Sequence, residues 1–246
     1  MTVRTAHVAG LVDVPVVRTP LLRMTERQVA SAARYGEIIL IYGAAGLGKT
    51  LAVRHAVEAQ TMPHLWVQVG PLPSPKEVVV RLLKEIEGSF PSKGDTLYEM
   101  ADRLIELLDD QKRIVVLDEA QNFSKAGIDQ LRNIHDRSTG FPLILVGGAT
   151  TNNVIGSDPQ LNDRVAGRVA FRPLADTQLI GTLRSYHPYL GDADPTLIFE
   201  VNASYARGVF RRWARILKEA VELTGGGGTL DRKTARAVLA KIGGGT

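Results

Sequence analysis

Two neighbouring carboxylates follow an apolar run, and together they could hold a metal ion and activate water. Residues 114–121 read IVVLDEAQ, so four apolar residues lead directly into Asp118 and Glu119. Adjacent carboxylates repel each other, and burial of either one without a positive partner costs several kcal/mol. The pattern therefore predicts that positive charge lies beside this segment. The alternative is a solvated acidic turn, which is common after strands.

A glycine-rich segment about 70 residues upstream is the candidate source of that charge. Residues 43–50 read GAAGLGKT and match G-x-x-x-x-G-K-[ST] in full, between an apolar run and a predicted helix. Glycines let backbone N–H groups surround phosphate oxygens, and the start of a helix favours anions. A glycine-rich turn that matches by chance is the alternative. The predicted phosphate-binding residues are Gly43, Ala44, Ala45, Gly46, Leu47, Gly48, Lys49, Thr50 and Leu51.

The two motifs together predict phosphoryl chemistry on a nucleotide with Mg²⁺. Lys49 is expected to reach the β- and γ-phosphates, and Thr50 with Asp118 to hold the metal. Glu119 is expected to orient and deprotonate the attacking water. A carboxylate in this place favours hydrolysis, because enzymes that transfer phosphate to a substrate take the nucleophile from that substrate.

Short apolar segments alternate with helical patterns up to Leu174, which predicts a parallel sheet covered on both faces. The predicted strands are 37–43, 64–70, 113–118, 142–148 and 168–174. The predicted helices between them are 25–35, 49–60, 76–87, 95–110, 124–138 and 158–166. Thr25 to Gln28 resembles a capping box and is expected to open the first helix.

No strand pattern follows Pro173, so an all-helical tail is expected. Its predicted helices are 176–186, 196–204, 207–223 and 231–242, and GGGG at 225–228 and GGG at 243–245 are expected to be flexible. The chain has no cysteine, no signal-peptide pattern and no apolar run long enough to span a membrane. A cytoplasmic protein without membrane contact is expected.

The segment 117–148, LDEAQNFSKAGIDQLRNIHDRSTGFPLILVGG, resembles AAA+ ATPases of the transposition-regulator group, to which phage Mu B protein, TnsC and TniB belong. It is also similar to ExeA-type secretion ATPases and, more distantly, to Cdc6/Orc initiators. The resemblance implies a P-loop NTPase fold with five parallel strands in the order 5-1-4-3-2. It also implies an ATP-binding core over 1–174, with an N-terminal segment and helix over 1–36, and a helical lid over 175–246.

The same resemblance implies further residues around the nucleotide. A polar sensor residue is expected at the end of the fourth strand, where this chain has Gly148. The candidates to replace it are Thr150, Thr151 and Asn152.

Three arginines are implied as well. The segment 161–174 resembles the part that holds an arginine finger, with Arg164 as first choice and Arg168 as second. Arg211, in ARGVFRRW, resembles the lid sensor that contacts the γ-phosphate. Surface arginines are the alternative. A finger supplied to a neighbouring subunit implies a homo-oligomer, either a ring or a helical filament.

The resemblance also implies a function on duplex DNA. It implies an ATPase that oligomerises on DNA without sequence specificity and regulates transposition with a transposase or targeting protein. The candidate DNA contacts are Lys76, Lys93 and Lys125, although solvated lysines are common. Two alternatives stay open: an ATPase of a secretion or helicase-loading system, and a nucleotide-dependent interaction switch.

Overall fold

The computed structural model describes residues 15–71 and 73–243. The chain divides into two compact units. Among the described residues, the sheet unit comprises Pro20–Ala45 and Lys49–Phe171, and the helical unit comprises 15–19, Gly46–Gly48 and 172–243. Residues 1–14 of the predicted N-terminal segment and most of the predicted flexible glycines at 243–245 lie outside the described residues.

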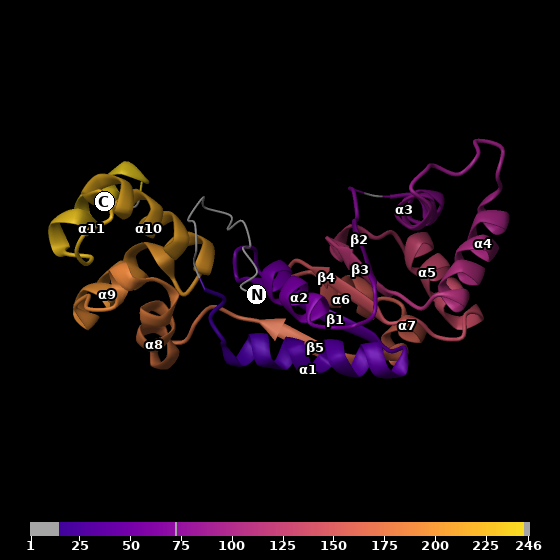
Figure 1. The fold of residues 1–246 in the computed structure, drawn as a ribbon, viewed down its shortest axis with the longest axis horizontal. Coiled ribbons are helices and arrows are strands. Elements are labelled where there is room, and N and C mark those ends of the chain that lie inside the picture. The colour runs from indigo at the N-terminus through magenta and orange to yellow at the C-terminus, as the bar shows by residue number, and fades with distance from the viewer. Residues whose placement is uncertain (1–14, 72, 244–246) are drawn as a thin grey trace. The chain divides into compact units, whose positions relative to one another are not determined.

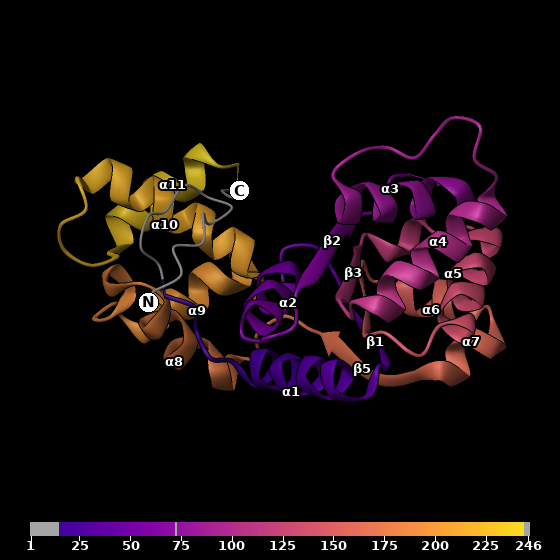
Figure 2. The ribbon, with the colours of Figure 1, turned by 45° about the vertical axis from the view of Figure 1, so that its right-hand side comes forward.

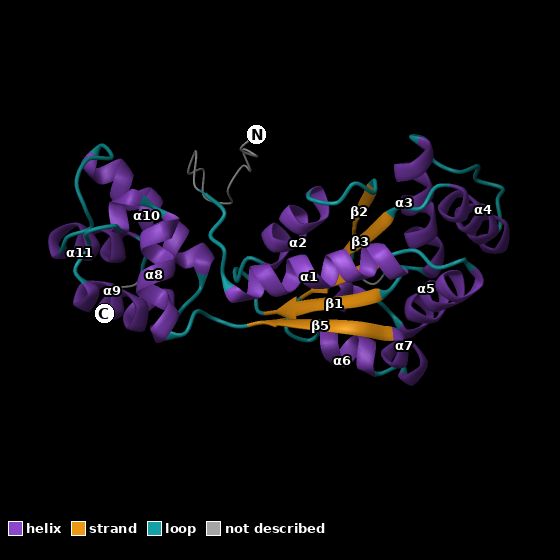
Figure 3. Cartoon of the chain, turned by 60° about the horizontal axis from the view of Figure 1, so that its bottom comes forward, coloured by secondary structure: helices purple, strands orange, loops and turns teal. Residues whose placement is uncertain are grey.

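The sheet unit contains five parallel strands in the order β2-β3-β4-β1-β5 (Figure 1, Figure 3). The strands are β1 (Ile38–Gly43), β2 (His64–Gln68), β3 (Ile114–Asp118), β4 (Leu143–Gly147) and β5 (Val165–Phe171). This order is the predicted 5-1-4-3-2 read from the opposite edge, so the predicted fold class is confirmed. All five carboxyl ends lie at one edge of the sheet because the strands are parallel.

Helices cover both faces of this sheet (Figure 2). Helices α1 and α2 pack against each other and against β1 and β4, and α3, α4 and α5 pack together over the other face. The helices of the unit are α1 (Pro20–Tyr35), α2 (Lys49–Glu58), α3 (Pro75–Glu87), α4 (Leu97–Asp110), α5 (Lys125–Arg137), α6 (Thr151–Gly156) and α7 (Pro159–Arg164). The central strands are buried on both faces, which explains their continuous apolar sequence.

Two predictions for the sheet unit were wrong, and one helix was missed. Helix α1 begins at Pro20, five residues before the predicted capping box, because proline suits the first helical position. Thr25 is instead buried inside the helix, where its hydroxyl donates to Leu21 O at 2.9 Å. The last strand spans Val165–Phe171, with its residues alternately buried and exposed, and not 168–174. The short helix α6 had not been predicted.

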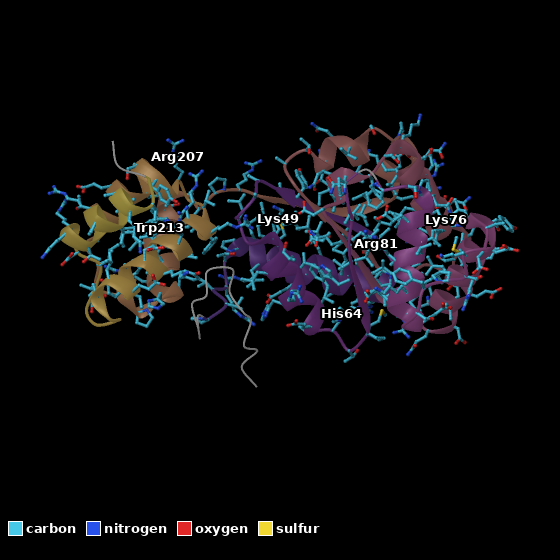
Figure 4. The ribbon with its side chains drawn as sticks, turned by 90° about the horizontal axis from the view of Figure 1, so that it is seen from above. Lys49, His64, Lys76, Arg81, Arg207 and Trp213 are labelled. Atoms are coloured by element: carbon cyan, nitrogen blue, oxygen red, sulfur yellow. The ribbon has the colours of Figure 1, made fainter. Side chains whose placement is uncertain are left out.

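The helical unit is built from α8 (Asp176–Tyr186), α9 (Pro195–Val201), α10 (Phe210–Thr224) and α11 (Arg232–Lys241). Its core surrounds Trp213, which is fully buried and labelled in Figure 4. A π-helical turn at Asn202–Ala206 follows α9, so α10 begins three residues later than predicted. Asn202 Oδ1 accepts hydrogen bonds from Gly208 N at 2.7 Å and from Trp213 Nε1 at 3.4 Å, which ties this turn to α10. No helix within 15–71 and 73–243 has the length and apolar character that a membrane crossing requires.

Candidate active site

The glycine-rich segment forms the turn between β1 and α2. Gly43 ends β1 with a φ of 147°, and a Cβ there would lie 2.3 Å from Phe171 O of β5. Gly46 and Gly48 have φ values of 80° and 93°, a region that favours glycine. Helix α2 then begins at Lys49, so its first N–H groups face the turn. The predicted strand–turn–helix arrangement is therefore present, and Leu51 lies in the first turn of α2.

Lys49 folds back over this turn (labelled in Figure 4). Its Nζ donates hydrogen bonds to Gly43 O at 2.8 Å and to Ala44 O at 2.9 Å. The ammonium group is therefore held beside the backbone that would surround a phosphate. An anionic oxygen is a stronger partner for an ammonium than a neutral carbonyl.

Asp118 ends β3 and contacts Thr50, the residue that follows Lys49. The Thr50 hydroxyl donates to Asp118 Oδ2 at 3.3 Å, although the two residues are 68 positions apart. The residue after the edge strand β2 supports the same end, since Val69 N donates to Asp118 O at 2.7 Å. A hydroxyl and a carboxylate oxygen side by side match the hard oxygen ligands that Mg²⁺ prefers. The side chains present therefore fit the predicted metal.

Burial raises the pKa of the Asp118 carboxyl, and the neighbouring Glu119 carboxylate raises it further. Hydrogen bonds from Glu119 N and Thr50, together with the charge of Lys49, lower it by less. Lys49 supplies positive charge beside the acid pair and lowers the pKa of Asp118, but burial outweighs the lysine. A divalent cation at this position would add the positive charge that the carboxylate lacks.

Glu119 lies one residue past β3 in a left-handed backbone conformation. Its φ is 62°, which costs roughly 1–2 kcal/mol for a residue with a Cβ. A single turn of 3-10 helix, Ala120–Asn122, follows it. The Glu119 side chain accepts a hydrogen bond from Gln121 Nε2.

Gln121, the last residue of the segment IVVLDEAQ, was not among the predicted site residues. Its Oε1 accepts a hydrogen bond from Gly148 N at 2.7 Å, directly after β4. Thr151 is fully buried; its hydroxyl donates to Gly148 O at 2.8 Å and lies 3.4 Å from Gln121 Oε1. Of the three candidates predicted to replace a side chain at Gly148, Thr151 is the one whose side chain joins this network, whereas Thr150 and Asn152 precede and follow it at the start of α6.

The two arginine-finger candidates lie close together in the chain: Arg164 is the last residue of α7, and Arg168 lies on β5. Arg164 forms a bidentate pair with Asp136 of α5, with Nε–Oδ1 and Nη2–Oδ2 distances of 2.5 and 2.8 Å. Its Nη1 also donates to Gln160 O at 2.6 Å. Arg168 lies on β5 and donates to the side chain and backbone of Asn162. Both arginines are exposed on the sheet unit.

The remaining predicted residues are spread over both units. Arg211 is the second residue of α10 in the helical unit. Lys76 is exposed on α3, and its Nζ donates to Asp95 O at 2.8 Å (labelled in Figure 4). Lys93 is exposed in the loop before α4, and Lys125 is exposed at the start of α5.

The turn between β1 and α2, the acid pair after β3 and the strand order together define a P-loop NTPase fold of the AAA+ type. A family model described as AAA domain matches residues 32–155, half of the chain. The chain belongs to the AAA domain family. The matched part of the AAA domain runs from α1 into α6 and includes Lys49, Asp118 and Glu119. Membership supports the predicted enzyme class, an ATP-hydrolysing enzyme.

Solved structures share the fold of this AAA domain protein at low sequence identity. Cdc6p from Pyrobaculum aerophilum has a TM-score of 0.73 and 16% identity, with 92% of this chain and 69% of that chain covered. The Aeropyrum pernix ORC1 protein, solved in complex with DNA, has a TM-score of 0.70, 21% identity and coverages of 92% and 66%.

Thermotoga maritima RuvB, a Holliday junction branch migration motor, has a TM-score of 0.58, 15% identity and coverages of 92% and 70%. The chain therefore spans about two thirds of the length of these proteins. None of the curated proteins matches the sequence. The similarity to archaeal ORC1 and Cdc6p, which was predicted as the more distant one, concerns the fold alone.

Proposed function

We propose that this AAA domain protein is an ATPase that assembles on duplex DNA and regulates transposition by selecting target sites. The observation that carries the ATPase part is the 3.3 Å contact between Thr50 Oγ1 and Asp118 Oδ2, which brings the glycine-rich turn and the acid pair together. In this proposal residues 1–174 form the nucleotide-binding core and 175–246 form a lid that carries Arg211.

Different groups of this chain have different roles in ATP hydrolysis. Backbone N–H groups of residues 43–50 bind the phosphates, and Lys49 exchanges its two carbonyl partners for phosphate oxygens. Thr50 and Asp118 hold Mg²⁺, which neutralises phosphate charge when bound. Glu119, one residue after the metal-binding aspartate, is the general base and accepts a proton from the attacking water.

The proposed active site is completed by a neighbouring subunit. Arg164, the last residue of α7, is exposed and is paired with an exposed carboxylate, Asp136. An arginine in this state can exchange its partner for the γ-phosphate of an adjacent copy at small cost, since exposed pairs contribute little. Such a head-to-tail contact closes into a ring or continues as a helical filament.

The DNA part of the proposal has three supports. The segment 117–148 resembles transposition regulators, the fold is shared with the ORC1 protein that was solved with DNA, and exposed lysines are present at positions 76, 93 and 125. Small contributions from each subunit add along an assembly, so contacts to phosphates suffice for binding without sequence preference. A transposase or targeting protein would then bind the assembly.

Electron microscopy with duplex DNA and a slowly hydrolysed ATP analogue tests this proposal. We expect regular rings or helices on DNA for the wild-type chain, and none for Lys49→Ala. Glu119→Gln should form them with ATP itself, because binding is kept while hydrolysis is blocked. Isolated particles with no change on addition of DNA and nucleotide would refute the assembly. A secretion ATPase or a simple interaction switch predicts that negative result.

A further inference from the structure

The side chain of Gln121 joins the ends of β3 and β4. Its Nε2 donates to the carboxylate of Glu119, and its Oε1 accepts from Gly148 N at 2.7 Å. A carboxylate accepts hydrogen bonds and a backbone N–H donates them, so only one orientation of the amide satisfies both partners. The amide therefore fixes where the Glu119 carboxylate lies.

Gln121 also fills the space beside Gly147, the last residue of β4. A Cβ on Gly148 would lie 3.5 Å from Gln121 Cδ, an ordinary contact distance. A Cβ on Gly147 would lie 2.5 Å from Gln121 Oε1 and 2.2 Å from Thr151 Oγ1, which is too close. Gly147 thus leaves the room that the Gln121 amide needs, and Gly148 lies in ordinary contact with it.

We infer that Gln121 is a positioning residue for ATP hydrolysis, an inference that rests on the proposed role of Glu119 as the base. Oε2 of the Glu119 carboxylate accepts a hydrogen bond from the amide, and in this inference Oε1 accepts the proton of water. Gln121 supplies, through Gly148 N, the link to β4 that a side chain at position 148 would otherwise supply. Thr151 supports the link by donating to Gly148 O.

The backbone of this segment agrees with such a role. Glu119 adopts its positive φ and is followed by the 3-10 turn that brings Gln121 back toward it. A strained residue keeps its conformation only where the surrounding contacts determine it. The amide contributes two such contacts, one on each side of the site.

The test compares Gln121→Met, which keeps the length of the side chain and removes both hydrogen bonds, with Gln178→Met. Gln178 is exposed on α8 in the helical unit and serves as the control. We expect Gln121→Met to lower kcat for ATP about tenfold to hundredfold, with nucleotide affinity changed less than about threefold. Gln178→Met should leave both quantities unchanged. A wild-type kcat for Gln121→Met would overturn the inference.

A compensating pair separates positioning from a purely structural role. Gln121→Ala should lose turnover like Gln121→Met, and adding Gly148→Asn should restore part of it, about fivefold or more. Asparagine fits at 148 because the backbone is outside the left-handed region and the amide it would meet is gone. Equal turnover of the single and double variants, both folded by circular dichroism, would contradict the inference.

A parallel Glu119→Gln variant separates the role of Gln121 from that of Glu119. Loss of hydrolysis in Glu119→Gln with normal turnover in Gln121→Met refutes only the role of Gln121. Normal turnover in Glu119→Gln refutes the proposed base itself, and the inference fails with it. Loss in both, with rescue by asparagine at 148, supports both assignments.

Discussion

Arg164 and Asp136 form a bidentate ion pair at the surface of the sheet unit, with distances of 2.5 and 2.8 Å. The pair competes with any role of Arg164 toward a second subunit. Because it is exposed, it contributes no more than about 1 kcal/mol, equivalent to about a fivefold change in an equilibrium. Asp136→Asn should therefore raise the ATPase rate of the assembled protein by up to about fivefold, measured by phosphate release with DNA present.

The control for this prediction is Asp129→Asn on the same helix, which loses the pair with Arg132 instead. It should leave turnover unchanged. A lower rate in Asp136→Asn would mean that the pair holds Arg164 in its active position.

Arg164→Ala should lower turnover by about 10³-fold while nucleotide affinity stays within a few-fold of wild type, because a finger acts on the charge of the transition state. Mixing this variant with Lys49→Ala protein should restore activity, since mixed interfaces then contain one intact site. Arg168→Ala is the matched control, expected to keep most of the activity. Absence of recovery in the mixture would exclude a shared site built on Arg164.

Gly147 and Gly148 should differ sharply in their tolerance of alanine. A Cβ at Gly147 would lie 2.2 Å from Thr151 Oγ1, and one at Gly148 would meet its nearest neighbour at 3.5 Å. Gly147→Ala should lower the free energy of unfolding by about 1–3 kcal/mol, and Gly148→Ala by much less. Urea denaturation of the two variants measures the difference. Equal stability would show that Gln121 and Thr151 move apart easily.

Acidic pH should destabilise the fold through His135. Burial lowers its pKa, and its Nε2 lies 3.2 Å from both Gly36 O and Phe141 O, so the neutral ring donates to these carbonyls. A pKa lower in the folded than in the unfolded state means that the unfolded chain binds the proton first. The free energy of unfolding should thus be constant above about pH 7.5 and fall as pH drops through 6.5.

His135→Gln should show a shallower pH dependence of the free energy of unfolding over the same range, measured by urea denaturation. His64→Gln, at the exposed start of β2, is the control and should keep the wild-type slope. The same slope in all three proteins would exclude His135. Burial also lowers the pKa of His187 in the helical unit, so a residual slope is expected.

Nucleotide and metal should stabilise the chain together. A ligand at about 100 times its Kd adds about 2.7 kcal/mol to the free energy of unfolding, so ATP with Mg²⁺ should raise Tm by several degrees. Removal of Mg²⁺ with a chelator should reduce this shift, and Asp118→Asn should reduce the part that depends on the metal. Lys49→Ala should lose most of the shift. A shift in Asp118→Asn that responds to the chelator as in wild type would exclude Asp118 as a metal ligand.

The sequence by itself determined the central strands and both chemical motifs. Strands buried on both faces are continuously apolar, and a full phosphate-loop pattern placed between a strand and a helix rarely arises by chance. The neighbouring charges of Asp118 and Glu119 already required a positive partner. The positions of Lys49, Thr50 and both acids followed from local patterns of this kind.

The tertiary structure alone decided which distant side chains meet. In the sequence Gln121 is an ordinary polar residue. In the fold, the 3-10 turn and the neighbouring strand place its amide between Glu119 and Gly148. The pairing of Arg164 with Asp136 depends in the same way on how α5 and α7 pack. Such contacts depend on strand order and on the backbone path after each strand. These are properties of the packed sheet, and the spacing of residues along the chain does not contain them.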